Sequence, residues 1–344
     1  MNLDKFMGCI MAIGVCDAFG VPFETMTPDE IEILELVGYT LDGYFCPSIN
    51  PHPFPDVVGK SKGSWSDDTQ LTLVTMESLI ESNGKFDMEI LARKHVDAYK
   101  VSAGRGWGKS TRNSCQRLLE EAHWTKSGEP HGEGNGIMMK ISPMGLRESM
   151  CAKAPEEFIR LRFLKECIDY ARMTHRSFAA VAAGCVHAYA VYFLARQTSH
   201  ELPNDFLENI SAYAIFTEQY LSPETPIYRQ IALLSAMKEN GSLARETPRQ
   251  ISMRFGGGTK AAFSAINSLG TSYAAFLRNP QNFDCIADCI RMGGDTDSNA
   301  AITGSLLGAL HGISIIPEKF IEEMENSGSL REKIKEFYNT CIEK

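Results

Sequence analysis

Two acidic clusters, far apart in the sequence, contain the side chains best suited to chemistry. The first reads Trp-Ser-Asp-Asp-Thr over residues 65–69, and the second reads Gly-Gly-Asp-Thr-Asp-Ser-Asn over residues 293–299. Each lies at the start of a predicted helix, where Asp and Ser commonly cap free N–H groups. Capping alone would explain either cluster. If the two helix starts meet in space, however, four carboxylates converge and repel one another unless cations are present.

The donor atoms of these clusters are all oxygens, which indicates hard metal ions. Carboxylate and hydroxyl oxygens favour Mg²⁺ or Mn²⁺ over zinc. Asp67, Asp68, Asp295 and Asp297 would together suit two ions, about 3.5–4 Å apart, that bridge a water or a substrate oxygen. Convergence of the clusters would therefore create a dinuclear metal site.

Two other motifs share features with the second cluster. Asp295, Asp297 and Asn299 occupy the first, third and fifth positions of an EF-hand loop. The sixth and twelfth residues are Ala300 and Leu306 instead of Gly and Glu, which excludes that motif. Asp-x-Asp also occurs in aspartyl-phosphate phosphatases, where it follows a buried strand. Because a helix and a Gly-Gly turn are predicted here, a phosphatase is the weaker alternative, and it requires a strand before Asp295.

The composition is that of a globular protein and argues against nucleic acid as a partner. The net charge is −9 and no long basic run occurs, whereas nucleic-acid-binding proteins carry a basic face. The apolar run 178–194 is short for a membrane span and contains His187, which favours a buried helix. The N-terminal apolar run has no signal-peptide cleavage site. The ten scattered cysteines are typical of reduced thiols, so we expect a cytoplasmic monomer without membrane attachment.

Helical spacing of apolar residues recurs along the whole chain, and the alternation typical of strands is scarce. We predict one all-α unit over residues 1–344, a single compact orthogonal multi-helix domain with no internal repeat. The proline-rich stretch 46–64 and the glycine-rich stretch 125–136 are predicted loops. Asp87 is a predicted N-cap and Pro155 a predicted first-turn proline. Helices are predicted at 68–82, 87–99, from 155 onward, 177–196, 206–220, 227–238, 259–277, 283–292, 297–311 and 330–343.

Six motifs, in the same order along the chain, resemble those of the ADP-ribosylglycohydrolase family. This family includes the dinitrogenase-reductase-activating glycohydrolase and the animal ADP-ribosylhydrolases. The motifs are Asp17-Ala-Phe-Gly-Val-Pro-Phe-Glu24, the cluster 65–69, Arg105-Gly-Trp-Gly108, Gly134-Asn-Gly136 with Lys140-Ile-Ser-Pro143 after it, Thr174-His175, and the cluster 293–298.

The resemblance implies hydrolysis of ADP-ribose from a modified protein or a small adduct, by cleavage at C1 of the distal ribose. It also implies an all-α fold with two metal ions, Mg²⁺ or Mn²⁺. The implied catalytic residues are Glu24, Asp67 and Asp68. The implied metal ligands are Ser66, Asp67, Asp68, Asp295, Asp297 and Ser298. The implied substrate contacts are Trp107, Gly132, Gly134, Asn135, Gly136 and His175, with residues 131–136 as a phosphate-cradling turn.

Several of these residues also have a purely structural interpretation. Asn135 between glycines suits any tight turn, Trp107 could stack on adenine or close a loop, and His175 could cap a helix. For the whole chain, a catalytically silent ADP-ribose-binding relative is the alternative to a hydrolase. The retained aspartates and Glu24 argue for the hydrolase. The sequence does not specify the acceptor, which could be arginine, serine, the ribose polymer or another group, and a role in immunity to a toxin stays open.

Overall fold

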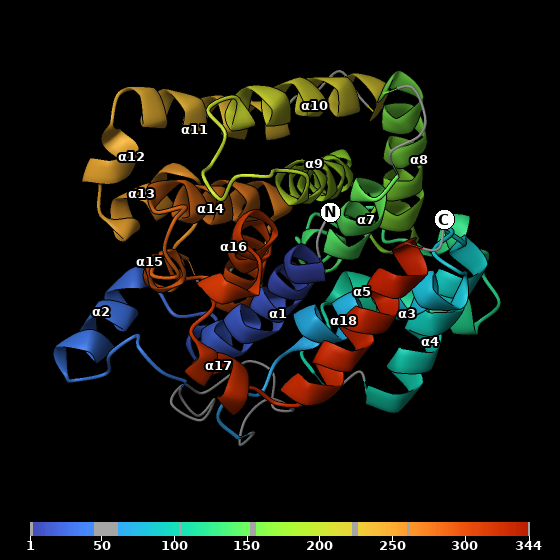
Figure 1. Cartoon of the computed structure of the whole chain (residues 1–344), viewed down its shortest axis with the longest axis horizontal. Helices are drawn as coiled ribbons and strands as arrows, with labels where there is room; N and C mark the ends of the chain where they lie inside the picture. The colour runs from blue at the N-terminus through green and yellow to red at the C-terminus, as the bar shows by residue number, and fades with distance from the viewer. Residues whose placement is uncertain are drawn as a thin grey trace.

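Two helices, α1 (Leu3–Gly20) and α16 (Thr296–His311), form the centre of the molecule in the computed structural model (Figure 1). Every residue of α16 is buried, and so is every residue of α1 from Lys5 onward. Helices that are buried on all sides lie in the middle of a packed domain. The remaining helices surround this pair.

Small residues allow α1 and α16 to pack with their backbones in direct contact. A Cβ atom on Gly308 would lie 2.1 Å from the carbonyl oxygen of Gly8, and one on Gly304 would lie 2.6 Å from Cys16 Sγ. A Cβ on Gly20 would lie 2.5 Å from the Cα of Asp297. The helices are therefore antiparallel, and the end of α1 meets the start of α16. This register places the first family motif beside the second acidic cluster.

The structure describes residues 3–44, 61–102, 105–151, 156–221, 226–259 and 262–342. In these ranges no strand forms, and the only β-bridges are two isolated ones. The all-α prediction is confirmed. The other α-helices are α2 (Pro28–Leu36), α3 (Asp67–Glu81), α4 (Met88–Ser102), α5 (Lys109–Leu119), α6 (Trp124–Ser127), α7 (Ser142–Ser149), α8 (Glu156–Thr174), α9 (Phe178–Ala195), α10 (Phe206–Leu221), α11 (Pro226–Glu239), α12 (Ser242–Arg245), α13 (Pro248–Arg254), α14 (Ala265–Arg278), α15 (Cys285–Arg291), α17 (Glu318–Glu323) and α18 (Ser327–Ile342).

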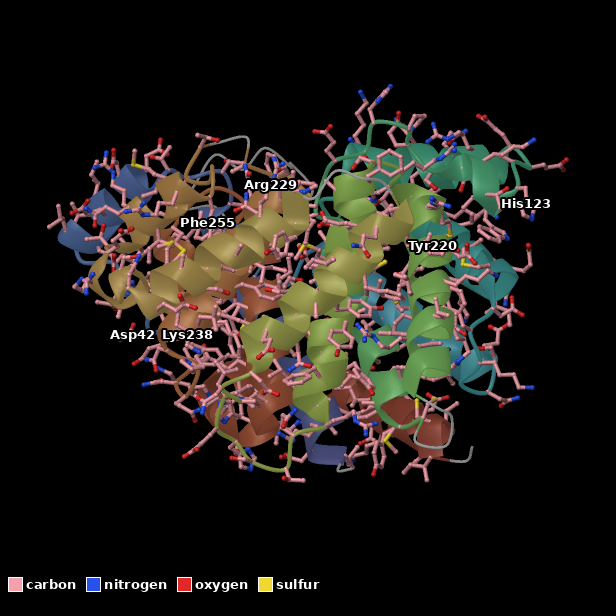
Figure 2. All side chains as sticks on the ribbon, turned by 90° about the horizontal axis from the view of Figure 1, so that it is seen from above. Asp42, His123, Tyr220, Arg229, Lys238 and Phe255 are labelled. Atoms are coloured by element: carbon pink, nitrogen blue, oxygen red, sulfur yellow. The ribbon has the colours of Figure 1, made fainter. Side chains whose placement is uncertain are left out.

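The outer helices form layers on both sides of the central pair. In Figure 1, α9 and α14 lie above the centre with α10 and α11 beyond them, while α3, α4 and α18 lie on the opposite side. Viewed from above, side chains with nitrogen and oxygen atoms at their ends project around the outline of the molecule, His123 among them (Figure 2). The segments 3–23 and 178–195 are long and apolar enough to cross a membrane, yet 100% and 78% of the most apolar 18-residue window in each are buried within the structure. Such burial is that of core helices.

Most long predicted helices are present with small shifts at their ends. Asp87 Oδ1 accepts hydrogen bonds from the N–H groups of Glu89 and Ile90, which confirms the predicted cap of α4. One boundary was wrong: the helix predicted from residue 259 begins at Ala265, because Ser264 caps it. The predicted loop 125–136 contains most of the short helix α6. Pro155 and most of the predicted loop 46–64 lie outside the described residues.

Candidate active site

Asp17, near the end of α1, fixes the N-terminus of α3. Its carboxylate accepts hydrogen bonds from the N–H of Ser66 at 2.9 and 3.1 Å, and from the N–H and Oγ1 of Thr69 at 3.0 and 2.5 Å. The N–H of Asp67 donates to the carbonyl oxygen of Arg105 at 2.9 Å. The first turn of a helix has N–H groups without partners inside the helix. Here these groups are bound from α1 and from the Arg105 loop, which holds the first acidic cluster in place.

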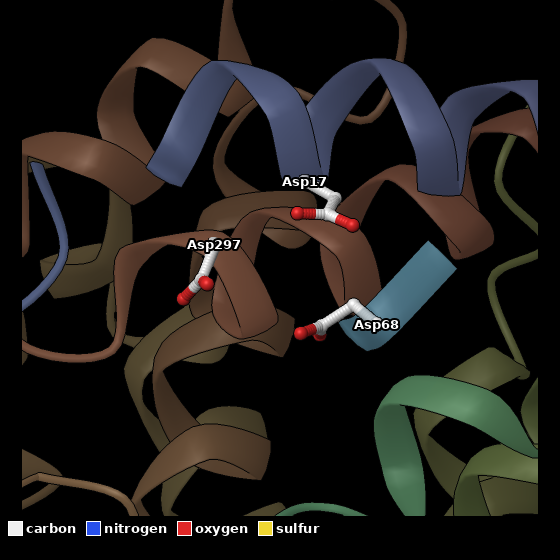
Figure 3. Close-up of side chains that lie close together, drawn as sticks. All are labelled: Asp17, Asp68 and Asp297. Atoms are coloured by element: carbon white, nitrogen blue, oxygen red, sulfur yellow. The ribbon is translucent and has the colours of Figure 1, made fainter. Parts of the chain in front are cut away.

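The antiparallel packing of α1 and α16 brings the two acidic clusters together. Carboxylate oxygens of Asp17, Asp68 and Asp297 lie within 4.8 Å of one another (Figure 3). Oxygens of Glu24, Asp295 and Asp297 form a second such group. Asp297 belongs to both groups, so the two candidate cation sites are adjacent. All five side chains are buried.

Burial and mutual repulsion raise the pKa values of these carboxyl groups. Burial raises the pKa of Asp17 to about 7 and that of Asp67 to about 8, and repulsion from Asp297 adds to both shifts. The same causes, in the same order, raise the pKa values of Glu24, Asp68 and Asp295 well above their usual range. Such a cluster binds either protons or cations.

The serines of both clusters lie at the same site. Ser66 is the N-cap of α3: its Oγ accepts from the N–H of Asp68 at 3.3 Å and donates to Asp68 Oδ2 at 3.0 Å. The other oxygen of that carboxylate, Oδ1, is buried without a hydrogen-bond partner. Ser298 follows Asp297 at the start of α16 and lines the same cavity. A buried carboxylate oxygen without a donor is suited to a cation.

Glu24 extends into the site from a segment attached to the second cluster. It follows the 3-10 helix Val21–Phe23. The N–H of Thr25 donates to the carbonyl oxygen of Gly294, and the N–H of Gly294 donates to that of Met26, both at 2.7 Å. These hydrogen bonds position Glu24 opposite the two aspartates of α16.

These side chains surround one cavity of about 370 Å³. This volume is within the range of small-molecule binding pockets. Eleven of the thirteen predicted site residues line it, including all seven that carry a carboxyl or hydroxyl group, together with several residues of α5. The lining residues are Glu24, Ser66, Asp67, Asp68, Arg105, Gly106, Gly108, Lys109, Ser110, Thr111, Arg112, Gly134, Asn135, Gly136, Met139, His175, Phe263, Asp295, Asp297 and Ser298.

The glycine loop 134–136 forms one wall of the cavity, and Asn135 attaches it to the second cluster. The Asn135 side chain donates to Ser268 Oγ at 2.8 Å and to Asp295 Oδ2 at 2.6 Å, and its N–H donates to the carbonyl oxygen of Phe263 at 3.0 Å. A Cβ on Gly136 would lie 2.9 Å from His175 Cε1. Asn135 therefore orients a candidate metal ligand as well as lining the cavity.

His175 is a neutral side chain on the same wall. Burial, with a further contribution from Lys140, lowers the pKa of its imidazole to about 3. Its Nδ1 lies 2.9 Å from Thr174 Oγ1. The uncharged ring can therefore present a hydrogen-bonding edge to the cavity.

Two predicted substrate contacts lie away from the cavity. Trp107 is buried against Leu71, Val74 and Cys115, and its Nε1 donates to Gln70 Oε1 at 2.7 Å. In the described structure the ring is buried and does not line the cavity, so stacking of adenine on Trp107 stays a prediction. Gly132 is buried in a turn in which a Cβ would lie 3.0 Å from Ser110 Oγ. It supports the loop without lining the cavity.

The sequence reasoning assigned no role to two parts of the site. Asp17 belongs to the first motif but was assigned no role of its own, although an Asp inside the apolar stretch 6–20 is a signal for a buried polar contact. The start of α5, 11 residues long, also reaches the cavity, and its N-cap Gly108 supplies no side-chain acceptor. Its first-turn N–H groups are therefore available to an anion.

Comparison with known proteins assigns the class. The model of the ADP-ribosylglycohydrolase family matches residues 1–344, so the chain belongs to the ADP-ribosylglycohydrolase family. Its members are ADP-ribosyl hydrolases, and the prediction of a glycosidic-bond hydrolase is confirmed. The phosphatase alternative is wrong, because helix α15, and no strand among the described residues, precedes Asp295.

Several individual relatives match nearly the whole chain. The chain is 24% identical to the ADP-ribosylarginine hydrolase Tri1 of Serratia proteamaculans, over 94% of this chain and 76% of the relative. It is 23% identical to the ADP-ribosylhydrolase ARH3 of Bos taurus, over 94% and 89%. A solved structure of an ADP-ribosylglycohydrolase-related protein complex superposes with a TM-score of 0.70, at 22% identity and 98% coverage of both chains. The last comparison supports the fold.

Proposed function

We propose that this chain removes ADP-ribose from a modified protein or a small adduct by metal-dependent cleavage at C1 of the distal ribose. One observation carries the proposal: the two acidic clusters and Glu24 meet in a single cavity, as two adjoining carboxylate groups that share Asp297. Membership of a hydrolase family supports the reaction class.

The residues present fit two divalent cations. The donors are carboxylate and hydroxyl oxygens, which favour Mg²⁺ or Mn²⁺, and the Asp68 Oδ1 atom has no other partner. When bound, such ions supply positive charge to oxygens of the sugar and lower the pKa of water. The residues that would hold them are Ser66, Asp67, Asp68, Asp295, Asp297 and Ser298. Asp17 makes its hydrogen bonds to α3 and supports this set.

The diphosphate would lie between the glycine loop and the start of α5. Residues of both elements line the cavity, and a helix N-terminus favours negative charge. Lys109 and Arg112 line the same cavity and add positive charge to a protein whose net charge is −9.

The reaction breaks the bond between C1 and the acceptor atom, and water supplies a hydroxyl group to C1 and a proton to the acceptor. Positive charge develops on the ribose in an oxocarbenium-like transition state. The buried carboxylates are placed to stabilise that charge. The Glu24 carboxyl group lines the cavity beside Asp295 and Asp297, so we assign proton transfer, or orientation of the attacking water, to Glu24.

The acceptor class and the cellular setting are further parts of this proposal. The name ADP-ribosylarginine hydrolase of one relative makes arginine-linked ADP-ribose the first substrate to test. The described cysteines are all free thiols, which supports a reducing, cytoplasmic location. We propose a monomer, which light scattering of the purified chain would test.

A hydrolysis panel tests the proposed function. Arginine-linked, serine-linked and O-acetyl ADP-ribose would be incubated with the purified chain in chelator, in Mg²⁺ and in Mn²⁺, with Asp295→Asn as the inactive control. We expect release of ADP-ribose from at least one substrate, in divalent cation only. Binding of ADP-ribose without hydrolysis of any substrate would identify a catalytically silent relative instead.

A further inference from the structure

Three side chains from distant parts of the chain enclose the segment that leads into the first acidic cluster. Trp65 precedes Ser66, Arg105 lies in the loop before α5, and Glu325 lies just before α18. We call Trp65, Arg105 and Glu325 the clamp. The clamp lies at the edge of the cavity, because Arg105 also lines it.

The Arg105 guanidinium makes three hydrogen bonds and stacks on an aromatic ring. Its Nη1 and Nη2 atoms donate to the two carboxylate oxygens of Glu325 at 3.1 and 2.7 Å. Nη1 also donates to the carbonyl oxygen of Trp65 at 2.8 Å, and the guanidinium carbon lies 3.6 Å from the centre of the Trp65 ring. Bidentate pairing and stacking on an aromatic ring are specific to arginine among the basic side chains.

Hydrogen bonds to backbone carbonyl oxygens also join the same three segments. The carbonyl oxygen of Arg105 accepts from the N–H of Asp67, and that of Glu325 accepts from the indole Nε1 of Trp65 at 3.0 Å. The N–H of Glu325 donates to the carbonyl oxygen of Gly63 at 3.0 Å. A Cβ on Gly63 would lie 2.3 Å from the carbonyl oxygen of Glu323, so only glycine fits this approach. Residues 63–67 are thus held from both sides.

We propose that Arg105 is a positioning residue for the first acidic cluster, and that Glu325 orients it. Arg105 fixes the carbonyl of Trp65 with its side chain and the N–H of Asp67 with its backbone, so it determines the direction in which Ser66, Asp67 and Asp68 enter the site. The C-terminal segment before α18 is therefore a part of the active-site architecture. The inference rests on the proposed function in one respect, which is that this cluster binds divalent cations.

The exposure of the clamp is consistent with this role. The side chains of Arg105 and Glu325 are 18% and 25% exposed, and Trp65 is buried. An exposed ion pair contributes little to stability, but here two hydrogen bonds, stacking and partial burial fix one geometry. Removing a group that orients a metal ligand typically lowers metal affinity by about 10–100-fold.

The test is the affinity of the full-length chain for Mn²⁺, measured by calorimetry and by electron paramagnetic resonance. Arg105→Lys keeps the charge but loses the bidentate geometry, and we expect Mn²⁺ affinity to fall by about 10–100-fold. Glu325→Gln should give a smaller loss, and the double variant should resemble Arg105→Lys, because both substitutions break the same contact. Arg331→Lys is the matched control, since Arg331 pairs with Glu318 on the surface of the same C-terminal region.

The outcomes separate the two proposals. Mn²⁺ binding by the unmodified chain with unchanged affinity in Arg105→Lys would overturn the positioning role and leave the proposed function intact. No Mn²⁺ or Mg²⁺ binding by the unmodified chain would overturn the proposed function itself. A role in stability alone predicts a lower melting temperature in metal-free Arg105→Lys with normal Mn²⁺ affinity, and this result too would overturn the inference. Weakened Mn²⁺ binding in Arg105→Lys, with a normal metal-free melting temperature and a normal Arg331→Lys control, would support it.

Discussion

Removing one carboxylate from the site should stabilise the metal-free protein, and Asp67→Asn is the sharpest test. The substitution removes a negative charge and keeps the side-chain shape. Burial, together with repulsion from Asp297 and Asp17, raises the pKa of Asp67 from its ordinary 3.8 to about 8. Between these two pH values the folded state keeps a proton that the unfolded state releases. The unfolding free energy therefore falls as pH rises from about 4 to about 8, and it levels off above.

The size of the effect follows from the pKa difference. Each unit of pKa is equivalent to about 1.4 kcal/mol. A folded-state pKa of about 8 therefore lowers the unfolding free energy by about 4 kcal/mol at pH 7 and by under about 2 kcal/mol at pH 5, compared with a carboxyl group that keeps its ordinary pKa. Buffer ions that enter the cavity screen part of the repulsion. We expect a gain of about 2–4 kcal/mol in Asp67→Asn at pH 7. For 344 residues this raises the melting temperature by about 3–6 °C, given an unfolding entropy of about 0.7 kcal/mol/K.

Differential scanning calorimetry in chelator, at pH 5 and pH 7, provides the measurement. The gain of the variant should shrink to about a third at pH 5, and it should reverse in Mg²⁺, because only the unmodified chain is then fully stabilised by its ligand. The exposed Asp205→Asn is the control and should change little at either pH. An unchanged or lower melting temperature for metal-free Asp67→Asn at pH 7 would refute the electrostatic account of the site.

Two further substitutions test the assigned roles. Glu24→Gln should lower turnover by about 10²–10⁴-fold, the usual effect of losing a general acid or base, and should change ADP-ribose affinity by under about tenfold. Near-normal turnover would contradict the catalytic role. A loss of both turnover and ADP-ribose affinity would make Glu24 a binding or metal residue. Gly136→Ala should weaken ADP-ribose binding by about tenfold, because its Cβ would lie 2.9 Å from His175 Cε1 and overpacking costs about 1–3 kcal/mol. Gly328→Ala is its control, because no atom lies within 4 Å of the added Cβ. Equal ADP-ribose affinity in the two variants would contradict the assignment of the glycine loop 134–136 to the ligand-binding wall of the cavity.

The long helices could be predicted because each carries its own signal. α10, α11 and α18 have apolar faces at helical spacing, α9 is apolar nearly throughout, and α16 becomes rich in small and apolar residues after its polar first turn. The short helices α12, α13 and α17 have only four to seven residues. Such segments contain less than two turns, so no periodicity can develop. They form because flanking caps and packing partners hold them, as the capping box of Thr247 does for α13.

The acidic centre of the site was also readable from the sequence, whereas its surroundings were not. Four aspartates at two helix starts predict cations if the helices meet, and packing of glycines of α1 and α16 brings them together. The direction of Trp107 depends on which neighbours surround its loop, and a tryptophan between glycines carries no information about that. The link from Asn135 to Asp295 and the pairing of Arg105 with Glu325 join residues far apart in the chain. Only the fold defines such contacts.

The most direct test of the central claim is a titration of the metal-stripped chain with Mn²⁺, in which hydrolysis and bound metal are followed together. The substrate is the one that the hydrolysis panel identifies as cleaved. Because the two groups of carboxylates share Asp297, we expect no activity without metal and saturation of the activity as two equivalents of Mn²⁺ bind. Full hydrolytic activity in the rigorously metal-free chain would contradict the proposed role of the acidic clusters.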